Sequence, residues 1–455
     1  MVFDQPWEGN ACAASATVLF DGDRYRMYYA GGMTKGNPTL NCYAESKDGI
    51  HWVKPELGLF EYGGSKKNNI TLGRFTPPAE PWDGYADTIG SYSSPFKDPN
   101  PNCKPDERYK AIYHVNEGLG ALKSADGIHW SPLTEKNRCI IKGAFDSQNL
   151  AFWDPIRGEY RAYMRSWNGN WRDIRTATSK DFFNWTELGN LEYPGSKAPN
   201  ARQQLYTNQV ISYYRAPHIL LGFPTRYTER GWSESMRALP ELEARKLRSA
   251  VSDRFGTALT DGLFMSSRDG RKFRLWSEAF IRPGLRGTDN WAYGDNYQTW
   301  GLVETKSANP DAPDEISITA TEGYNLGEAN KLRRFTIRQD GFVSMQASFA
   351  GGTFTTKPIT YQGDRLVLNF STSAAGIIRV AIQEADGKPI DGFTLDDCNE
   401  VFGDTLQGTV TWKHGSDLGK LAGRPIRLHV TLSDADLYAF QFVATGLEGH
   451  DHRGP

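Results

Sequence analysis

The chain has 455 residues, and its 52 lysines and arginines nearly balance its 54 aspartates and glutamates. This length allows one large core or two to three domains of ordinary size. Without a basic surplus or a Lys/Arg-rich run, the composition argues against a nucleic-acid partner. Aromatic residues make up 13% of the chain, including 13 Trp and 21 Tyr, which is typical of stacked sheets or of platforms for sugar rings.

The cysteines and the apolar segments exclude several further classes. The five cysteines are odd in number, widely spaced and without a C-x-x-C pair, so we expect mostly free thiols and no zinc site or disulfide framework. No apolar run reaches the length of a membrane-spanning helix, and the first ten residues lack the basic and apolar regions of an export signal. We therefore expect no membrane partner, no metal and no cofactor.

A short motif recurs along the first two thirds of the chain. It is "SKDGIHW" at 46–52, "SADGIHW" at 124–130, "SKDFFNW" at 179–185 and "SSRDGRKF" at 266–273. Tyr-rich segments precede the first three copies, with Tyr25, Tyr109 and Tyr160 at similar positions. Short apolar and β-branched runs with Asp, Gly and Pro between them predict strands and turns. Each repeat therefore predicts four antiparallel strands.

Repeats of this size are typical of the blades of a β-propeller. We predict an all-β protein whose residues 1–349 form a five-bladed β-propeller, with blades at about 11–62, 86–135, 145–192, 205–280 and 293–348. The last blade uses "YQTWGLVET", "EISITATE", "KLRRFTIRQ" and "GFVSMQA" as its strands. The Asp and Gly of each repeated motif are predicted to form the turn between the third and fourth strands, and its Trp or Phe to pack between blades. Asp48, Asp126, Asp181 and Asp269 are therefore predicted to be structural.

Two other segments differ from the repeats. Residues 233–256 are rich in Glu, Arg, Leu and Ala and predict a helical insertion inside the fourth blade, which we expect to lean over the channel mouth as a partial lid; a surface decoration is the alternative. After residue 350 the alternating strands lack the repeat, so residues 350–448 predict a β-sandwich. Residues 449–455 predict a disordered tail.

Propeller topology predicts which polar side chains share a face. The inner strand of each blade starts at one end of the channel, and the loop joining its second and third strands returns to that end. Carboxylates gathered there could supply the acid and the base that cleave a glycosidic bond. The catalytic candidates are Asp146, Glu322, Asp173, Asp295 and Glu8, with Asp87 on the same rim. The substrate-binding candidates are Trp7, Trp167, Arg172, Asn208, Arg226 and Asn296.

Within this set we rank Asp146 first as base or nucleophile, because Ser147, Gln148 and Asn149 could keep its carboxylate hydrogen-bonded and ionised. We rank Glu322 first as acid, because its sequence neighbours offer little polar support and would let its pKa rise. Glu8 with Asp295 is the alternative pair.

Several segments resemble a bacterial protein family that is similar to glycoside hydrolases of families 32 and 43. They include "PWEGN", "CYAESKDGIHW", "KGAFDSQNLAFWDP", "RDIRTATSKDF" and "YGDNYQTWGLVET", and the match runs from Trp7 to about residue 445. The resemblance implies the five-bladed fold, a carbohydrate substrate and a secreted or periplasmic location, with a further N-terminal segment in most members. Those hydrolases place an Asp at the start of the first inner strand, where this chain has Ser15 or a nearby Ala.

We therefore expect a glycosidase that cleaves a poly- or oligosaccharide by carboxylate chemistry. Two alternatives stay open. A glycoside phosphorylase could use Arg172, Arg202 and Arg226 to hold phosphate, and a non-catalytic carbohydrate-binding protein would bind the sugar without cutting it.

Overall fold

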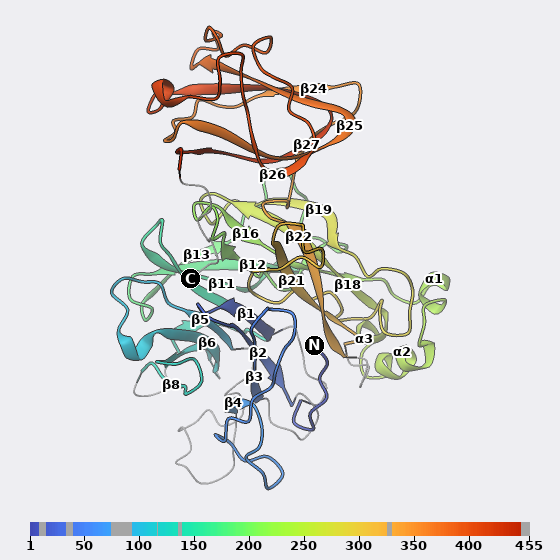
Figure 1. Cartoon of the computed structure of the whole chain (residues 1–455). Helices are drawn as coiled ribbons and strands as arrows, with labels where there is room; N and C mark the ends of the chain where they lie inside the picture. Colours follow the sequence, from blue (N-terminus) through green and yellow to red (C-terminus); the bar gives the residue numbers. More distant parts are fainter. Residues whose placement is uncertain are drawn as a thin grey trace. The chain divides into compact units, whose positions relative to one another are not determined.

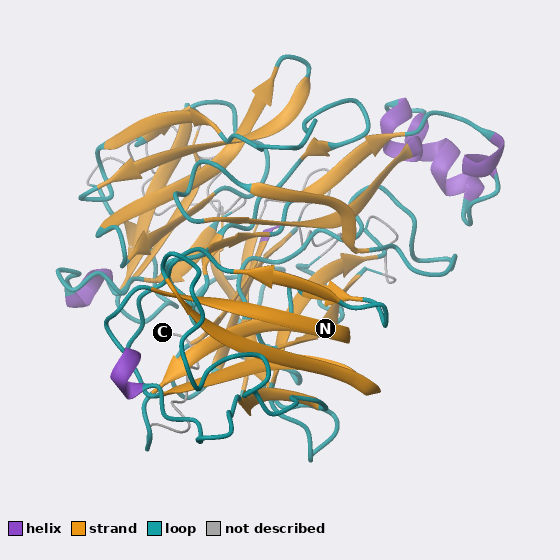
Figure 2. Cartoon of the chain, turned by 90° about the horizontal axis from the view of Figure 1, so that it is seen from above, coloured by secondary structure: helices purple, strands orange, loops and turns teal. Residues whose placement is uncertain are grey.

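The computed structural model describes residues 1–8, 15–32, 40–73, 93–115, 117–134, 139–324 and 330–446. Asp87, Cys12 and the predicted tail at 449–455 lie outside these residues. The described chain is mostly β-strand, as predicted (Figure 1, Figure 2). The described residues divide into two compact units, the first within 1–305 and 317–335, and the second within 306–316 and 336–446.

Within the described part of the first unit, successive segments of the chain each form their own antiparallel sheet, five in all. The first sheet contains β1 (Ala16–Phe20), β2 (Tyr25–Gly31), β3 (Leu40–Ser46) and β4 (Ile70–Gly73). The second contains β5 (Ser94–Lys97), β6 (Tyr109–Val115), β7 (Gly118–Ser124), β8 (Ser131–Pro132) and β9 (Ile141–Lys142). The third contains β10 (Leu150–Asp154), β11 (Glu159–Asn168), β12 (Trp171–Ser179) and β13 (Trp185–Asn190).

The fourth and fifth sheets complete the first unit. The fourth contains β14 (Gln204–Leu205), β15 (Ile211–Ser212), β16 (Leu220–Gly222), β17 (Thr225–Glu229), β18 (Ala258–Ser267) and β19 (Arg274–Ile281). The fifth contains β20 (Val303–Thr305), β21 (Glu315–Glu322) and β22 (Lys331–Arg338). The helical insertion is confirmed as three short helices between β17 and β18, namely α1 (Glu234–Arg237), α2 (Leu242–Ser249) and α3 (Asp253–Thr257) (Figure 1).

Hydrogen bonds link the five sheets in a closed cycle. The repeated tyrosines donate to the preceding sheet, since Tyr109 Oη lies 2.6 Å from Asp21 Oδ2 and Tyr160 Oη lies 2.6 Å from Asp98 Oδ2. Tyr25 Oη closes the cycle with a 2.6 Å bond to the Glu304 carbonyl of the fifth sheet. The remaining links are Tyr163 Oη to Gly270 O at 2.9 Å and Gln298 Nε2 to Leu263 O at 3.3 Å. The Tyr-rich repeat therefore joins neighbouring sheets.

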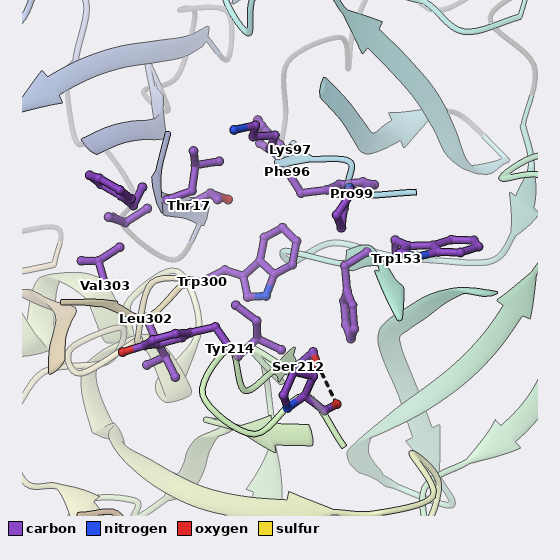
Figure 3. A pocket seen from close by; sticks show the side chains of 18 of the residues that line it. Thr17, Phe96, Lys97, Pro99, Trp153, Ser212, Tyr214, Trp300, Leu302 and Val303 are labelled. Carbon is purple, nitrogen blue, oxygen red and sulfur yellow. Dashed lines mark hydrogen bonds between the residues drawn. The ribbon is translucent and has the colours of Figure 1, made fainter. Parts of the chain in front are cut away.

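One strand from each of the five sheets also lines a single cavity of about 240 Å³. Its wall is mostly apolar, and Figure 3 shows the Trp300 indole among Phe96, Trp153 and Tyr214. Trp300 is buried, and its Nε1 donates to Val210 O at 2.9 Å. A cavity bounded by β1, β5, β10, β15 and β20 requires these strands to face a common axis.

The repeated motif is the predicted turn after the third strand. In each of the four copies the Ser Oγ accepts from the Gly or Phe backbone N–H, and one Asp oxygen accepts from the next two backbone N–H groups. Burial acts to raise the pKa of Asp181, but hydrogen bonds from Asn184 and Phe183 outweigh it and lower the pKa to about 2. The structural role predicted for the four aspartates is confirmed.

Three strand assignments in the repeats are wrong. Met345–Ala347 (β23), predicted as the last strand of the fifth blade, pairs with a strand of the second unit instead. Its place next to β22 is taken by the start of the chain, where Met1 N donates to Leu332 O and Leu332 N to Met1 O, both at 2.9 Å. In the first two sheets β4 and β9 lie beyond the predicted blade ends at 62 and 135, because loops of unpredicted length precede these strands.

The second unit has one five-stranded sheet and its own apolar core. The strands are β23 (Met345–Ala347), β24 (Gly352–Thr355), β25 (Arg365–Glu384), β26 (Asp404–Thr409) and β27 (Ile426–Val443). The pairing of β25 with β27 shifts register between Asn369 and Phe370 and again between Thr372 and Ile377. These irregularities interrupt two strands of unusual length.

Candidate functional site

A β-hairpin of the third sheet places cationic and aromatic side chains on one face. The two-residue turn between β11 and β12 contains Gly169 at φ 59°, a conformation that glycine adopts at little cost. Trp167 and Arg172 are direct cross-strand partners, and Arg165 lies two residues before Trp167, so the three side chains share a face. The guanidinium carbons of Arg165 and Arg172 lie 5.1 and 5.3 Å from the Trp167 ring centre.

Tyrosines from the fourth and fifth sheets complete this group, which we call the arginine–tyrosine cluster. Arg172 lies 5.1 Å from the ring centre of Tyr206 and 4.4 Å from that of Tyr227. Tyr293 Oη donates to Tyr206 Oη at 3.3 Å. The cluster comprises Arg165, Trp167, Arg172, Tyr206, Tyr227 and Tyr293. Trp167 remains 47% exposed, so its ring is available to a ligand.

The cluster carries buried positive charge. Arg165 and Arg172 are 8% and 6% exposed. Burial lowers the pKa of Arg165, and repulsion from Arg172 lowers it further, against the attraction of Tyr206. His114 on β6 is also affected, because burial and then the charge of Arg165 lower its pKa to about 4. His114 is therefore neutral at pH 7 beside these arginines.

Asp295 is the carboxyl group whose protonation the fold changes most clearly. It is 1% exposed, and its oxygens accept backbone N–H bonds from Ala292 at 2.9 Å and Tyr324 at 3.0 Å. Burial raises its pKa to about 7, and nearby Glu322 acts in the same direction, while the two N–H bonds and Arg248 oppose the rise. Near neutral pH this group can therefore donate a proton.

The helical insertion contacts the segment that carries Asp295. Arg245 on α2 donates its Nη2 to Asn290 O at 3.4 Å and is 2% exposed, and Arg248 on the same helix is close enough to lower the pKa of Asp295. Phe255 on α3 packs against Tyr293 with ring centres 5.8 Å apart. These contacts join the insertion to the candidate site. Whether it acts as a lid stays a prediction.

Asp146 lies on the rim of the same cluster. Its side chain is 67% exposed and forms an ion pair with Arg165. The expected support from the three following residues is wrong, because Gln148 and Asn149 donate to backbone oxygens instead. Gln148 Nε2 donates to Ala16 O at 3.3 Å, and Asn149 Nδ2 donates to Ser147 O at 2.6 Å. The cation that pairs with Asp146 comes from β11 instead.

Glu322 does not fit the role of acid that its sequence neighbours suggested. Its Oε1 accepts from Arg333 Nη1 at 2.8 Å, and Lys331 Nζ lies 3.5 Å from its Oε2. Both cations lie on β22, the neighbour of β21 in the sheet, and Glu322 is the last residue of β21. The cations therefore come close to Glu322 only when the sheet forms. The premise of weak polar support is therefore wrong, and the acid candidate moves to Asp295.

Asp173 and Arg226 are committed to structural partners. Asp173 is buried and accepts hydrogen bonds from Ile174 N at 2.7 Å and Tyr193 Oη at 2.9 Å; burial raises its pKa against these bonds. Arg226 makes a two-point ion pair with Asp261, at 2.8 and 2.5 Å, and donates its remaining Nη1 to Ser277 O. Arg226 therefore has little capacity left for substrate or phosphate.

The other candidates support the backbone. Glu8 is fully buried, 2.8 Å from Lys54 Nζ and 2.5 Å from Tyr29 Oη, and Trp7 Nε1 donates to Asn69 Oδ1 at 2.7 Å. Asn208 donates to Tyr163 O, and Asn296, at φ 60°, donates to Thr260 O. These groups hold turns and neighbouring strands. The structure does not bring Glu8 and Asp295 together through any of these contacts.

The sequence interpretation missed Arg165, Arg248, Tyr206 and Tyr293. One signal for Arg165 was available, because it lies two positions before Trp167 in a predicted strand and so shares its face. Arg248 had no comparable signal, since its relation to Asp295 depends on how the insertion packs.

Metal-ligand sets and membrane-spanning helices are both absent from the described residues. No set of three His, Cys, Asp or Glu side chains gathers there as a metal cluster. No helix in this part of the chain is long and apolar enough to cross a membrane.

Comparison with known proteins gives no matching family model and no matching curated protein. Among solved structures, a thermostable family-43 glycoside hydrolase is 11% identical, with a TM-score of 0.44, covering 73% of this chain and 92% of that chain. An endo-arabinase from Bacteroides thetaiotaomicron is 10% identical, with a TM-score of 0.41 and coverage of 71% and 94%. An exo-inulinase from Aspergillus awamori is 11% identical, with a TM-score of 0.38 and coverage of 98% and 100%.

Proposed function

We propose that the chain is a glycoside hydrolase whose five successive sheets are the blades of a propeller and whose site is the arginine–tyrosine cluster. The closed cycle of hydrogen bonds between the sheets and the cavity bounded by one strand of each sheet support the propeller. The single observation that carries the activity is the pairing of unlike carboxyl groups around this cluster. Asp295 is buried, and Asp146 is exposed and ion-paired.

In this proposal Asp295 is the acid and Asp146 the base or nucleophile. A group that is protonated near pH 7 can give its proton to the leaving glycosidic oxygen. Asp146 is ion-paired with Arg165, and its carboxylate is assigned to take a proton from water or to attack the anomeric carbon. The contacts Asp146–Arg165–Tyr206–Tyr293 connect the base to the segment of the acid. The exposed face of Trp167 would support the sugar ring.

The test is a digestion screen of poly- and oligosaccharides with the parent protein, Asp295→Asn and Asp146→Asn, with and without inorganic phosphate. We expect reducing ends without added phosphate, and a loss of roughly 10²-fold or more in each variant. Dependence on phosphate would establish the phosphorylase alternative. Rates in both variants near those of the parent would refute the assignment.

A non-catalytic carbohydrate-binding protein is the second candidate, and one observation favours it. Ser15, Ser147, Gln209 and Gln298 are buried and uncharged, whereas bond cleavage requires a pair of carboxyl groups. Binding of a glycan without cleavage in the same screen would support this candidate.

We further propose that the second unit is a β-sandwich and that the protein works outside the cytoplasm. The register shifts in the long β25–β27 pair allow one sheet to fold over its own core. The location rests on the family resemblance, and cell fractionation of the native host would test it.

A further inference from the structure

Among the described residues, the arginine–tyrosine cluster has more positive charge than its partners balance. Arg165 has the ion pair with Asp146, but Arg172 donates its Nη1 to the neutral amide oxygen of Gln204 at 2.7 Å. Arg254 on α3 lies near the same tyrosines and interacts electrostatically with Tyr293, Tyr227 and Tyr206. Buried cations without anionic partners are costly to a fold.

Both buried guanidinium groups also retain an unused hydrogen-bond donor. The Nε atoms of Arg165 and Arg172 are buried and have no hydrogen-bond partner among the described residues. A buried donor without an acceptor costs about 1–3 kcal/mol, more for a charged group. Such a cost persists in a protein when the group has another use, and ligand binding is one such use.

These donors lie beside the one aromatic ring of the cluster that is most open to solvent. Arg165 and Arg172 are both within 5.3 Å of the Trp167 ring centre, and Trp167 is 47% exposed. A sugar ring that stacks on Trp167 would place its substituents near both guanidinium groups. Guanidinium groups bind carboxylate, sulfate and phosphate oxygens by paired hydrogen bonds.

We propose that Arg165 and Arg172 form an oxyanion subsite beside Trp167, and that the carbohydrate bound there carries a negatively charged group. A uronic acid carboxylate and a sulfate ester share this chemistry, and free inorganic phosphate beside a neutral sugar is the other source. The inference rests on the proposed function because it names the substrate class of the same site.

Calorimetric titration tests the subsite without requiring turnover. Asp295→Asn serves as the parent, so that cleavage does not consume the ligand. The ligands are a uronic acid oligosaccharide, a sulfated oligosaccharide, a neutral oligosaccharide of equal length, and inorganic phosphate. Arg172→Gln and Arg172→Lys are compared with Arg274→Gln. Arg274 is a matched control because it lies 5.0 Å from the Trp276 ring centre on the exposed side of β19.

We expect at least one anionic ligand to bind roughly tenfold or more tightly than the neutral one, which corresponds to one charge-assisted hydrogen bond. Arg172→Gln should remove this preference, Arg172→Lys should retain part of it, and Arg274→Gln should retain all of it. The ligand that shows the preference identifies the source of the oxyanion. Thermal unfolding of each variant establishes that it is folded.

Equal binding of neutral and anionic ligands, or a preference that survives Arg172→Gln, would overturn the subsite. The digestion screen tests the proposed function separately. Cleavage of a neutral glycan would leave the hydrolase standing without the subsite, and tight binding of an acidic glycan without cleavage would leave the subsite without the hydrolase.

Discussion

The repeated turns and the segment around Asp295 use the same side chain in opposite ways. Asp126 has a half-exposed side chain that accepts from Ile128 N and His129 N at 2.8 Å, and although burial acts to raise its pKa, these and other hydrogen bonds lower it. Asp295 also accepts two backbone N–H bonds, but it is 1% exposed and its pKa rises to about 7. Equal numbers of backbone donors therefore do not decide protonation, because burial can outweigh them.

The largest expected effect is on activity. Asp295→Asn should lower kcat by roughly 10²–10⁴-fold, the range for loss of a general acid, measured on a glycan that the parent cleaves. Asp269→Asn, in one of the repeated turns, is the matched control and should keep the rate within about threefold, because this aspartate is a turn residue. Equal losses in the two variants would show that the difference in burial has no catalytic meaning.

The second effect is on the pH dependence of stability. The pKa of Asp295 is higher in the folded state than in the unfolded chain, so its contribution to the free energy of unfolding falls as pH rises from about 4 to about 7. At about 1.4 kcal/mol per pKa unit, this contribution to the free energy of unfolding changes by a few kcal/mol at most. Between pH 5 and pH 8 the free energy of unfolding, measured in urea, should therefore fall less for Asp295→Asn than for the parent. Parallel pH profiles would contradict the raised pKa.

The third effect concerns the glycines of the turns. Gly127 and Gly22 both have φ near 77°, but a Cβ on Gly127 would lie 2.6 Å from Tyr28 Oη of the neighbouring sheet, whereas none lies within 4 Å at Gly22. Gly22→Ala should cost about 1 kcal/mol from backbone strain, and Gly127→Ala about 1–2 kcal/mol more from overpacking. Chemical denaturation measures both. Equal costs would show that the repeated turn does not pack tightly against the next sheet.

The smallest effect is a shift of the alkaline limb of the activity profile. Arg248 lowers the pKa of Asp295 and Glu322 raises it. Arg248→Gln should therefore move the loss of activity to higher pH, and Glu322→Gln to lower pH, each by less than about one unit. If Glu322→Gln instead abolished turnover at every pH, Glu322 would be the acid, as its sequence position first suggested.

The second unit shows the limits of local pattern. The alternating pattern predicts strands where β25 and β27 lie, but it also predicts Met345–Ala347 (β23) as the last strand of the fifth blade. β23 pairs with residues 435–437 of β27, which lie about 90 positions further along the chain. No local pattern specifies so distant a partner.

Local sequence determined the strands, the Ser-x-Asp turns and the tyrosines of the second strands, since period-two alternation and side-chain hydrogen bonds within four residues act over short distances. It also identified the helical insertion and named Trp167 and Arg172 as binding candidates. Only the tertiary structure decided which carboxyl group holds its proton. Glu322 forms ion pairs with Arg333 and Lys331 of a neighbouring strand. Asp295 is buried, and the charge of Arg248 on the insertion acts on it. The pKa of a side chain depends on charges and burial supplied by residues distant in sequence, so Asp295 became the candidate acid only after the sheets and the insertion were in place.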